Sequence, residues 1–228
     1  MSKNRRGLFI SFEGIDGCGK TTQVMLVYKY LIAQGRQVKL VREPGSTEAA
    51  ERIRALLLDR RLAIDERTEL LLYEAARADL AAREIAPALA RGLVVLCDRF
   101  YDSTTAYQGF GRRLDVAMVR ALHRVAVDDL EPDLTLVFDC DIRTAMGRRA
   151  GDPDRLTREA LGVVVPDRLE AESRAFFERV RKGFLEIARK ERRRVKVIDA
   201  AQPVETVFAD VKKHLVRKLR NHDAERRP

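Results

Sequence analysis

The sequence predicts an α/β fold, in which a five-stranded parallel sheet is covered by helices on both faces. Two observations lead to this prediction. Short apolar runs alternate with longer segments of helical spacing along most of the chain, which is typical of strand–helix–strand units. The run 93–97 is apolar without interruption, as expected of a strand that is buried on both faces of its sheet.

The elements follow one another in a regular order. Strands are predicted at 8–12, 38–41, 93–97, 134–138 and 195–198. Helices are predicted at about 20–34, 47–59, 66–90, 114–127, 167–190 and 204–219.

One segment fits neither pattern. Residues 147–166 are rich in Arg, Asp, Gly and Pro and follow no helical or strand period, so we interpret them as a lid insertion. We expect a single domain over residues 1–220, which includes this lid. The polar end of the chain, 221–228, is predicted to be a frayed tail.

The composition limits the partners and the compartment that the protein can have. The net charge is +9, from 44 lysines and arginines against 35 aspartates and glutamates, which suits a nucleic acid, an acidic membrane surface or a small polyanionic substrate. No apolar run approaches the roughly 20 residues of a membrane-spanning helix, and no signal peptide is recognisable. Three widely spaced cysteines favour a reducing compartment, so we expect a cytoplasmic protein.

A phosphate-binding loop lies between the first strand and the first helix. Residues 14–21 read GIDGCGKT and match G-x-x-x-x-G-K-[ST] in full. Backbone N–H groups and the helix N-terminus can hold phosphate there, Lys20 would bridge the outer phosphates, and the Thr21 hydroxyl would ligate Mg²⁺. The predicted nucleoside triphosphate site comprises Gly14, Ile15, Asp16, Gly17, Cys18, Gly19, Lys20, Thr21 and Thr22.

The same loop occurs in GTPases, but the chain argues against that class. Its only asparagines are Asn4 and Asn221, so it lacks the Asn-Lys-x-Asp motif that reads guanine.

Asp98 and Arg99 follow the buried strand 93–97, at the edge where parallel sheets bind ligands. Asp98 could hold Mg²⁺ or its water and Arg99 could clamp a phosphate, although a simple surface ion pair is the alternative.

With these segments in view, the chain resembles the thymidylate kinase (dTMP kinase) family of P-loop nucleoside monophosphate kinases. Residues 12–23 are similar to the family's F-E-G-x-[DE]-G-x-G-K-T-T-Q, and 42–47 to its R-E-P-G-G-T, with Ser46 in place of a glycine. Residues 98–109 resemble D-R-[FY]-x-x-S-x-x-A-Y-Q-G, 132–139 resemble P-D-L-T-x-x-L-D, and 167–170 resemble D-R-[IL]-E. These segments extend over about residues 8 to 220 in family order.

The resemblance implies a three-layer P-loop NTPase fold and a homodimer. The implied reaction is phosphoryl transfer from MgATP to dTMP, giving ADP and dTDP in dTTP synthesis. Lys20, Arg99 and Asp16 would be catalytic, and Thr21 and Asp98 would hold the metal. The implied substrate-binding residues are Asp16, Arg42, Pro44, Tyr73, Arg77, Arg99, Ser103, Thr104, Tyr107 and Gln108.

Family roles can be assigned to several of these residues. Tyr107 would pack under the deoxyribose, where a ribose 2′-hydroxyl would clash. Arg77 would hydrogen-bond the thymine edge, Thr104 would read the base, and Tyr73, where the family usually has Phe, would stack on it. Without the resemblance, Tyr73 and Arg77 would be interpreted as a helical core edge and a solvated arginine.

The chain also departs from the family pattern. Gly17 stands where some members carry a catalytic arginine in the phosphate loop, and members with glycine there supply that arginine from the lid. The candidates in this lid are Arg148, Arg149, Arg155 and Arg158, of which we favour Arg149 or Arg155.

Two other functions stay open from the sequence. One is a kinase of another nucleoside or nucleotide monophosphate on the same scaffold. The other is a basic nucleic-acid-binding ATPase, suggested by the positive charge of the segment 181–194. Such a run is more often a solvated helix face, and no aromatic residues interleave with it to stack on bases. We therefore expect neither a nucleic acid nor a membrane as partner.

Overall fold

The computed structural model describes residues 7–151, 168–169 and 172–225, and five parallel strands lie at its centre. The sheet has the order β2-β3-β1-β4-β5, and every neighbouring pair is parallel. The strands are β1 (Leu8–Glu13), β2 (Val38–Arg42), β3 (Val94–Asp98), β4 (Leu134–Asp139) and β5 (Val195–Asp199). The predicted sheet is confirmed, although each strand ends one residue later than predicted and β3 also begins one residue later.

Helices connect these strands. The α-helices are α1 (Lys20–Ala33), α2 (Glu48–Leu58), α3 (Glu66–Leu80), α4 (Ala86–Ala90), α5 (Tyr101–Thr104), α6 (Val116–Val127), α7 (Ile142–Ala150), α9 (Arg174–Lys190) and α10 (Val204–Glu225). Two π-helical segments, η2 (Ala81–Ile85) and η3 (Thr105–Gly111), continue α3 and α5.

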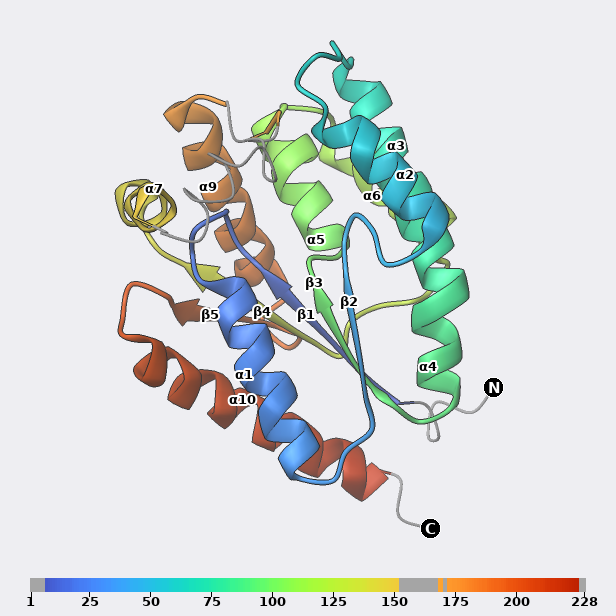
Figure 1. Ribbon diagram of the computed structural model, residues 1–228, viewed down its shortest axis with the longest axis vertical. Helices are drawn as coiled ribbons and strands as arrows, with labels where there is room; N and C mark the ends of the chain where they lie inside the picture. The colour runs from blue at the N-terminus through green and yellow to red at the C-terminus, as the bar shows by residue number, and fades with distance from the viewer. Residues whose placement is uncertain (1–6, 152–167, 170–171, 226–228) are drawn as a thin grey trace.

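Both faces of the sheet are covered, as predicted. Alternate side chains of β1 divide between two buried clusters: Ile10 belongs with Val27 of α1 and Val211 of α10, whereas Phe9 belongs with Leu80 of α3 and Ile85 of η2. Figure 1 shows α1 in front of the sheet and α9 behind it. The molecule therefore has three layers, and the carboxyl ends of the strands lie together at one edge.

The prediction of one continuous α-helix over 66–90 is wrong, because three helical segments divide this stretch. The π-helical segment η2 separates α3 from α4. Pro87 lies just beyond that segment and has no backbone N–H to donate, and in a regular α-helix its ring would clash with the preceding turn. The local widening of the helix accommodates this proline.

Three boundary predictions need correction. The predicted tail begins at residue 221, but α10 continues to Glu225, where Asp223 forms a bidentate ion pair with Arg36 at the end of α1. The predicted lid begins at 147, but α7 extends to Ala150, and the lid residues 152–166 lie outside the described part of the chain. The helix predicted from 167 begins instead at Arg174, because Ser173 caps it by accepting from the Phe176 N–H at 3.2 Å.

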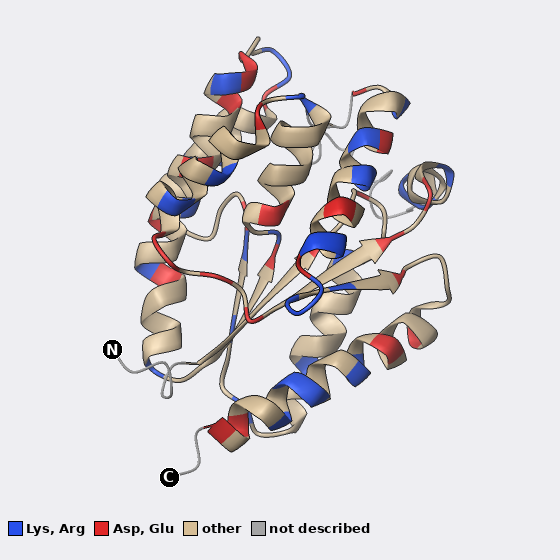
Figure 2. Ribbon diagram, turned by 180° about the vertical axis from the view of Figure 1, so that it is seen from behind, with Lys and Arg blue, Asp and Glu red and all other residues tan. Residues whose placement is uncertain are grey.

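The basic C-terminal helices carry acidic residues beside the basic ones, as Figure 2 shows for α9 and α10. Arg181 pairs with Asp139 at 2.6 Å, and Arg189 pairs with Glu186 at 2.9 Å. Much of the positive charge on α9 is therefore balanced locally. Within the described ranges, no helix has the length and apolar character needed to cross a membrane.

Candidate active site

The phosphate-binding loop connects β1 to α1, as predicted. Gly14, Gly17 and Gly19 all have positive φ angles, which lets the loop turn its backbone inward. Lys20 is buried, and its Nζ donates to the carbonyl oxygens of Gly14 and Ile15 at 3.1 Å each. The ammonium group is thus held inside the loop, next to the space where phosphate oxygens would bind.

Thr21 and Asp98 meet at the edge of the sheet. The Thr21 hydroxyl, in the first turn of α1, donates to Asp98 Oδ2 at the end of β3 at 3.1 Å. Mg²⁺ prefers oxygen ligands and usually keeps waters or substrate phosphates in its shell, so two protein oxygens suffice here. Within the described residues, no group of three or more His, Cys, Asp or Glu could hold a metal alone. This pair fits a metal that arrives with a nucleotide.

Asp16 and Arg99 link the phosphate loop to the segment after β3. Arg99 Nη2 donates to Asp16 Oδ1 at 2.6 Å, and its guanidinium lies 5.1 Å from the centre of the Tyr107 ring. The Tyr107 hydroxyl is 3.3 Å from both Arg99 Nη2 and Asp16 Oδ2. Burial alone would raise the pKa of Asp16, but Arg99 and Lys20 hold it well below its usual value. Asp16 is therefore a carboxylate between two cations.

Arg99 has a positive φ of 72°, which is a strained backbone conformation for a residue with a side chain. The buried Glu13 of β1 supports this turn. Its carboxylate accepts from the Phe100 N–H at 2.7 Å and from the Ser103 hydroxyl at 2.6 Å, and Ser103 in turn accepts from Arg99 Nη1 at 3.0 Å. Sequence reasoning did not single out Glu13, although it lies inside the F-E-G motif.

Arg77 of α3 is 1% exposed and is held on three sides. Its Nε donates to Glu43 Oε2 at 2.9 Å, its Nη1 to Glu74 Oε1 at 2.7 Å, and its Nη2 to Thr104 Oγ1 at 2.7 Å. Burial raises the pKa of Glu43 to about 7, although Arg77 opposes that rise. This arginine is not solvated, so the interpretation favoured without the resemblance was wrong.

A cavity lies between α2, α3, α5 and the carboxyl ends of β2 and β3, and it is named the acceptor cavity for the role that the resemblance implies. Nine of the ten implied substrate-binding residues line it: Asp16, Pro44, Tyr73, Arg77, Arg99, Ser103, Thr104, Tyr107 and Gln108. The structure adds four residues that the sequence reasoning missed: Glu43, Arg54, Leu58 and Leu169.

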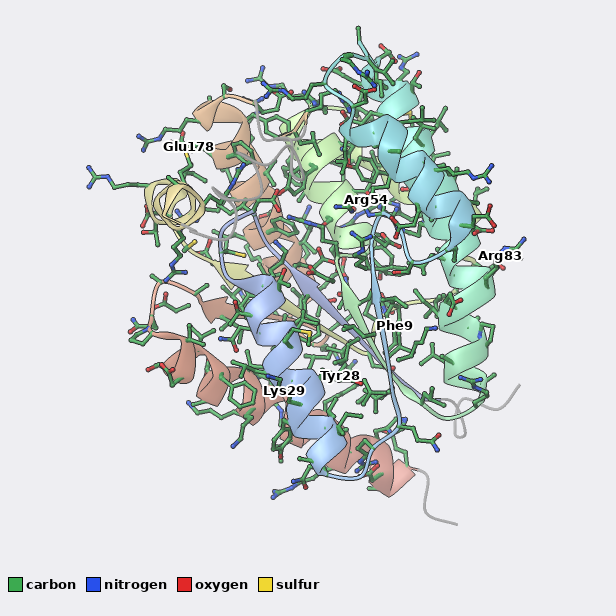
Figure 3. All side chains as sticks on the ribbon, viewed as in Figure 1. Phe9, Tyr28, Lys29, Arg54, Arg83 and Glu178 are labelled. Atoms are coloured by element: carbon green, nitrogen blue, oxygen red, sulfur yellow. The ribbon has the colours of Figure 1, made fainter. Side chains whose placement is uncertain are left out.

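Arg42 does not line this cavity. Its Nη2 donates to both Glu51 carboxylate oxygens, at 2.8 and 3.0 Å, and its side chain is half exposed. Arg54, one helical turn along α2 from Glu51, reaches the cavity instead and donates to the Pro44 carbonyl at 2.9 Å. Figure 3 shows Arg54 on the side of α2 that faces α5. The sequence predicted a helix there but did not indicate which of its faces meets the site.

A second cavity adjoins the acceptor cavity, and it is named the donor cavity for the role that the resemblance implies. It is lined by residues 16–23 of the phosphate loop and α1, by Arg148 and Arg149 of α7, and by the segment that leads from β5 into α10. Arg148 shapes that segment by donating to the carbonyls of Ala200 at 2.6 Å and Ala201 at 3.1 Å. Asp16 lines both cavities, so this residue lies where the two spaces adjoin.

Gly17 lets α7 approach the phosphate loop closely. A side-chain carbon at this position would lie 2.2 Å from the Ala145 carbonyl oxygen and 2.9 Å from Arg149 Cγ. The missing side chain therefore makes room for Arg149 beside the loop. Arg155 and Arg158, the other lid candidates, lie outside the described residues.

Comparisons with known proteins identify the family of the chain. A family model described as thymidylate kinase matches residues 12–211. Among curated relatives, thymidylate kinase of Geobacter sulfurreducens is 48% identical over 90% of this chain and 96% of its own length. That of Trichlorobacter lovleyi is 44% identical over 89% of this chain and 94% of its own length. A solved structure of thymidylate kinase from Ehrlichia chaffeensis superimposes with a TM-score of 0.71 at 35% identity, covering 92% of this chain and 98% of that one.

Proposed function

Since the chain belongs to the thymidylate kinase family and phosphorylates dTMP with ATP in dTTP synthesis, we propose that its two adjoining cavities hold the two nucleotides. ATP occupies the donor cavity and dTMP the acceptor cavity. The observation that carries this assignment is the position of Asp16, which lines both cavities and pairs with Arg99 at 2.6 Å. The reacting phosphates therefore meet beside this ion pair.

On the donor side, the inward-turned loop backbone and Lys20 bind the ATP phosphates. A divalent metal is general for kinases of this kind, and we assign Mg²⁺ to Thr21 and Asp98, whose oxygens lie 3.1 Å apart. When bound, the ion neutralises phosphate charge during transfer. Chelation of divalent metal should abolish activity, and added Mg²⁺ should restore it.

On the acceptor side, Arg99 and Arg54 bring positive charge to the dTMP phosphate. Tyr107 packs under the deoxyribose, and Arg77 and Thr104 present hydrogen-bonding groups to the thymine edge from the buried wall of the cavity. Tyr73, half-buried on α3, stacks on the base. An arginine fork with fixed partners suits the recognition of a carbonyl on a planar base.

Transfer itself needs no covalent intermediate. In-line phosphoryl transfer depends mainly on positioning and on neutralising the charge of the transferred group, which Lys20 and Arg99 supply here. Arg149 adjoins the phosphate loop at Gly17 and adds a third positive charge from α7. Asp16 keeps Arg99 oriented until the acceptor phosphate binds.

We also propose that the enzyme is a cytoplasmic homodimer. Leu56 of α2 and Leu71 of α3 are about half exposed, at 48% and 55%, on two helices that pack against each other. Exposed apolar side chains on neighbouring helices favour burial against a second copy. Light scattering during gel filtration should give twice the 26.0 kDa chain mass, and replacement of Leu71 by Glu should weaken that species.

A panel assay tests the substrate assignment. ADP release would be measured with thymidine, dTMP, dUMP, UMP, dCMP and dGMP as acceptors, each at several concentrations. We expect the highest kcat/KM with dTMP and none above background with thymidine. Preference for a nucleoside or another monophosphate would refute the dTMP assignment, and DNA-stimulated ATP hydrolysis without acceptor would favour a nucleic-acid-dependent ATPase.

A further inference from the structure

Behind the acceptor cavity, a buried histidine contacts the same carboxylate oxygen as Arg77. His123 of α6 is 6% exposed, and its Nδ1 lies 2.8 Å from Glu74 Oε1. Arg77 Nη1 donates to that same oxygen at 2.7 Å. On the other side of the ring, His123 Nε2 lies 2.9 Å from the hydroxyl of Thr105. His123 does not line the acceptor cavity and is absent from the motifs that identify the family.

These contacts close a ring. Arg77 donates to Thr104, Thr104 is covalently joined to Thr105, Thr105 contacts His123, His123 contacts Glu74, and Glu74 accepts from Arg77. The ring ties α3, α6 and the junction of α5 with η3 together inside the protein. Two of its members, Arg77 and Thr104, line the acceptor cavity.

The surroundings of His123 favour the neutral form of its imidazole. Burial lowers the pKa of His123, Glu74 opposes that shift, and the nearby Arg77 adds to it. The charge of Asp102 also opposes the lowering of the pKa of His123, and the ring of Tyr101 stacks on the imidazole with centroids 5.3 Å apart. In the neutral imidazole of His123, Nδ1–H donates to the Glu74 carboxylate and Nε2 accepts from the Thr105 hydroxyl.

Glu74 needs this support to hold a single orientation. Its second carboxylate oxygen, Oε2, is buried without a hydrogen-bond partner in the described part of the chain. A partial turn of the carboxyl group about its Cγ–Cδ bond would carry Oε1 away from both Arg77 and His123. The His123 hydrogen bond favours one rotamer of Glu74, and therefore one direction of the Arg77 guanidinium.

We propose that His123 is a positioning residue for base recognition, which orients Arg77 and Thr104 toward the thymine edge through Glu74 and Thr105. The proposal rests on the proposed role of Arg77 at the base. Thymine offers a carbonyl oxygen at the position where cytosine carries an amino group, so a fixed donor should favour dTMP over dCMP. An enzyme whose Arg77 guanidinium is displaced should lose its preference for dTMP over dCMP while it still transfers the phosphoryl group.

A matched pair of substitutions separates the two contacts of the ring. His123→Asn places an amide donor where Nδ1 stood, and so keeps the bond to Glu74. His123→Gln places its amide where Nε2 stood, and so keeps only the bond to Thr105. The measurements are KM and kcat for dTMP and dCMP, KM for ATP, and the melting temperature of each variant.

We expect His123→Gln to raise the KM for dTMP by about tenfold or more, the size expected from loss of a hydrogen bond to a charged group. Its dTMP/dCMP preference should fall by a similar factor, while the KM for ATP stays unchanged. His123→Asn should stay within about threefold of the wild type. Equal behaviour of the two variants, or an unchanged base preference in His123→Gln, would overturn the proposal.

Two further variants keep the proposal testable if the first pair does not fold or if its premise is wrong. If the His123 variants do not fold, Glu74→Gln keeps the shape of the side chain but removes the charge that His123 and Arg77 contact, and it should reduce the dTMP/dCMP preference. An unchanged preference there would count against the proposal. Arg77→Lys tests the premise separately: if the base preference survives that change, the role proposed for Arg77 fails, whatever the His123 variants do.

Discussion

The Glu13 carboxyl group, buried at the end of β1, lies 2.6 Å from the hydroxyl oxygen of Ser103. Burial raises the pKa of Glu13 from its ordinary 4.5 to about 8, and the charge of Asp102 adds to that rise. The folded protein therefore binds a proton at Glu13 that the unfolded chain releases between these two pH values. Stability from this group is present below about pH 4.5 and is lost as the pH rises toward 8.

Glu13→Gln should remove this pH dependence. Glutamine has the shape of the protonated carboxyl, so its oxygen can still accept from the Phe100 N–H and its amide can donate to Ser103. Thermal unfolding would be followed from pH 5 to 8.5. We expect the wild type to lose melting temperature toward pH 8 and the variant to lose less. Parallel curves for the two proteins would show that Glu13 does not cause the change.

Arg99→Ala should reduce kcat by at least about 10³-fold, because positive charge on the transferring phosphoryl group is worth roughly 10³–10⁵ in rate in related systems. The matched control is Arg52→Ala on α2, whose side chain is 80% exposed and pairs only with Glu48 among the described residues. That variant should keep wild-type kinetics. Circular dichroism would check that both variants fold, and a folded Arg99→Ala enzyme with normal turnover would contradict the assignment.

The neighbouring arginines of α7 should have separable roles. Arg149 adjoins the phosphate loop, so Arg149→Ala should lower kcat by about tenfold or more with little change in the KM for ATP. Arg148 holds the Ala200 and Ala201 carbonyls, so Arg148→Ala should mainly raise the KM for ATP. Steady-state kinetics at varied ATP would distinguish the two. If Arg155→Ala alone lowers kcat, the catalytic arginine is Arg155 and not Arg149.

Tyr107 should make the enzyme selective for deoxyribonucleotides. Its ring is 5% exposed and is fixed by Phe176 and Phe184, with ring centroids 6.1 and 6.2 Å away, so it cannot easily withdraw from a 2′-hydroxyl. We expect kcat/KM for dUMP to exceed that for UMP by about tenfold or more. Comparable values for these two substrates, which differ only at that hydroxyl, would exclude this role.

The sheet and the phosphate loop could be predicted because their signals are local. Five apolar runs specify the strands, and the spacing of glycines before Lys20 specifies the loop. The interruption of the helix by η2 also had a local signal in Pro87, which the periodicity of the segment 66–90 obscured. Local patterns of this kind need no knowledge of what lies next to them in space.

The remaining features depend on partners far along the chain. Asp223 extends α10 by pairing with Arg36, a residue 187 positions away, and nothing in the polar C-terminal segment indicates that contact. Arg54 and Arg42 are both basic residues near the same turn, but only Arg54 reaches the acceptor cavity, because Glu51 holds Arg42 outside it. The buried roles of Glu13 and His123 likewise arise only when separate elements pack together.

The shared wall at Asp16 has a practical consequence for inhibitor design. Because Asp16 lines both of the cavities proposed to hold the nucleotides, a single molecule could fill the two at once if its linker passes that side chain. The linker would have to carry negative charge to compete with Asp16 for Arg99 and Lys20. A neutral linker of the same length would leave those two cations unmatched, so the difference in affinity between the two compounds would report how much of the binding energy lies at the junction.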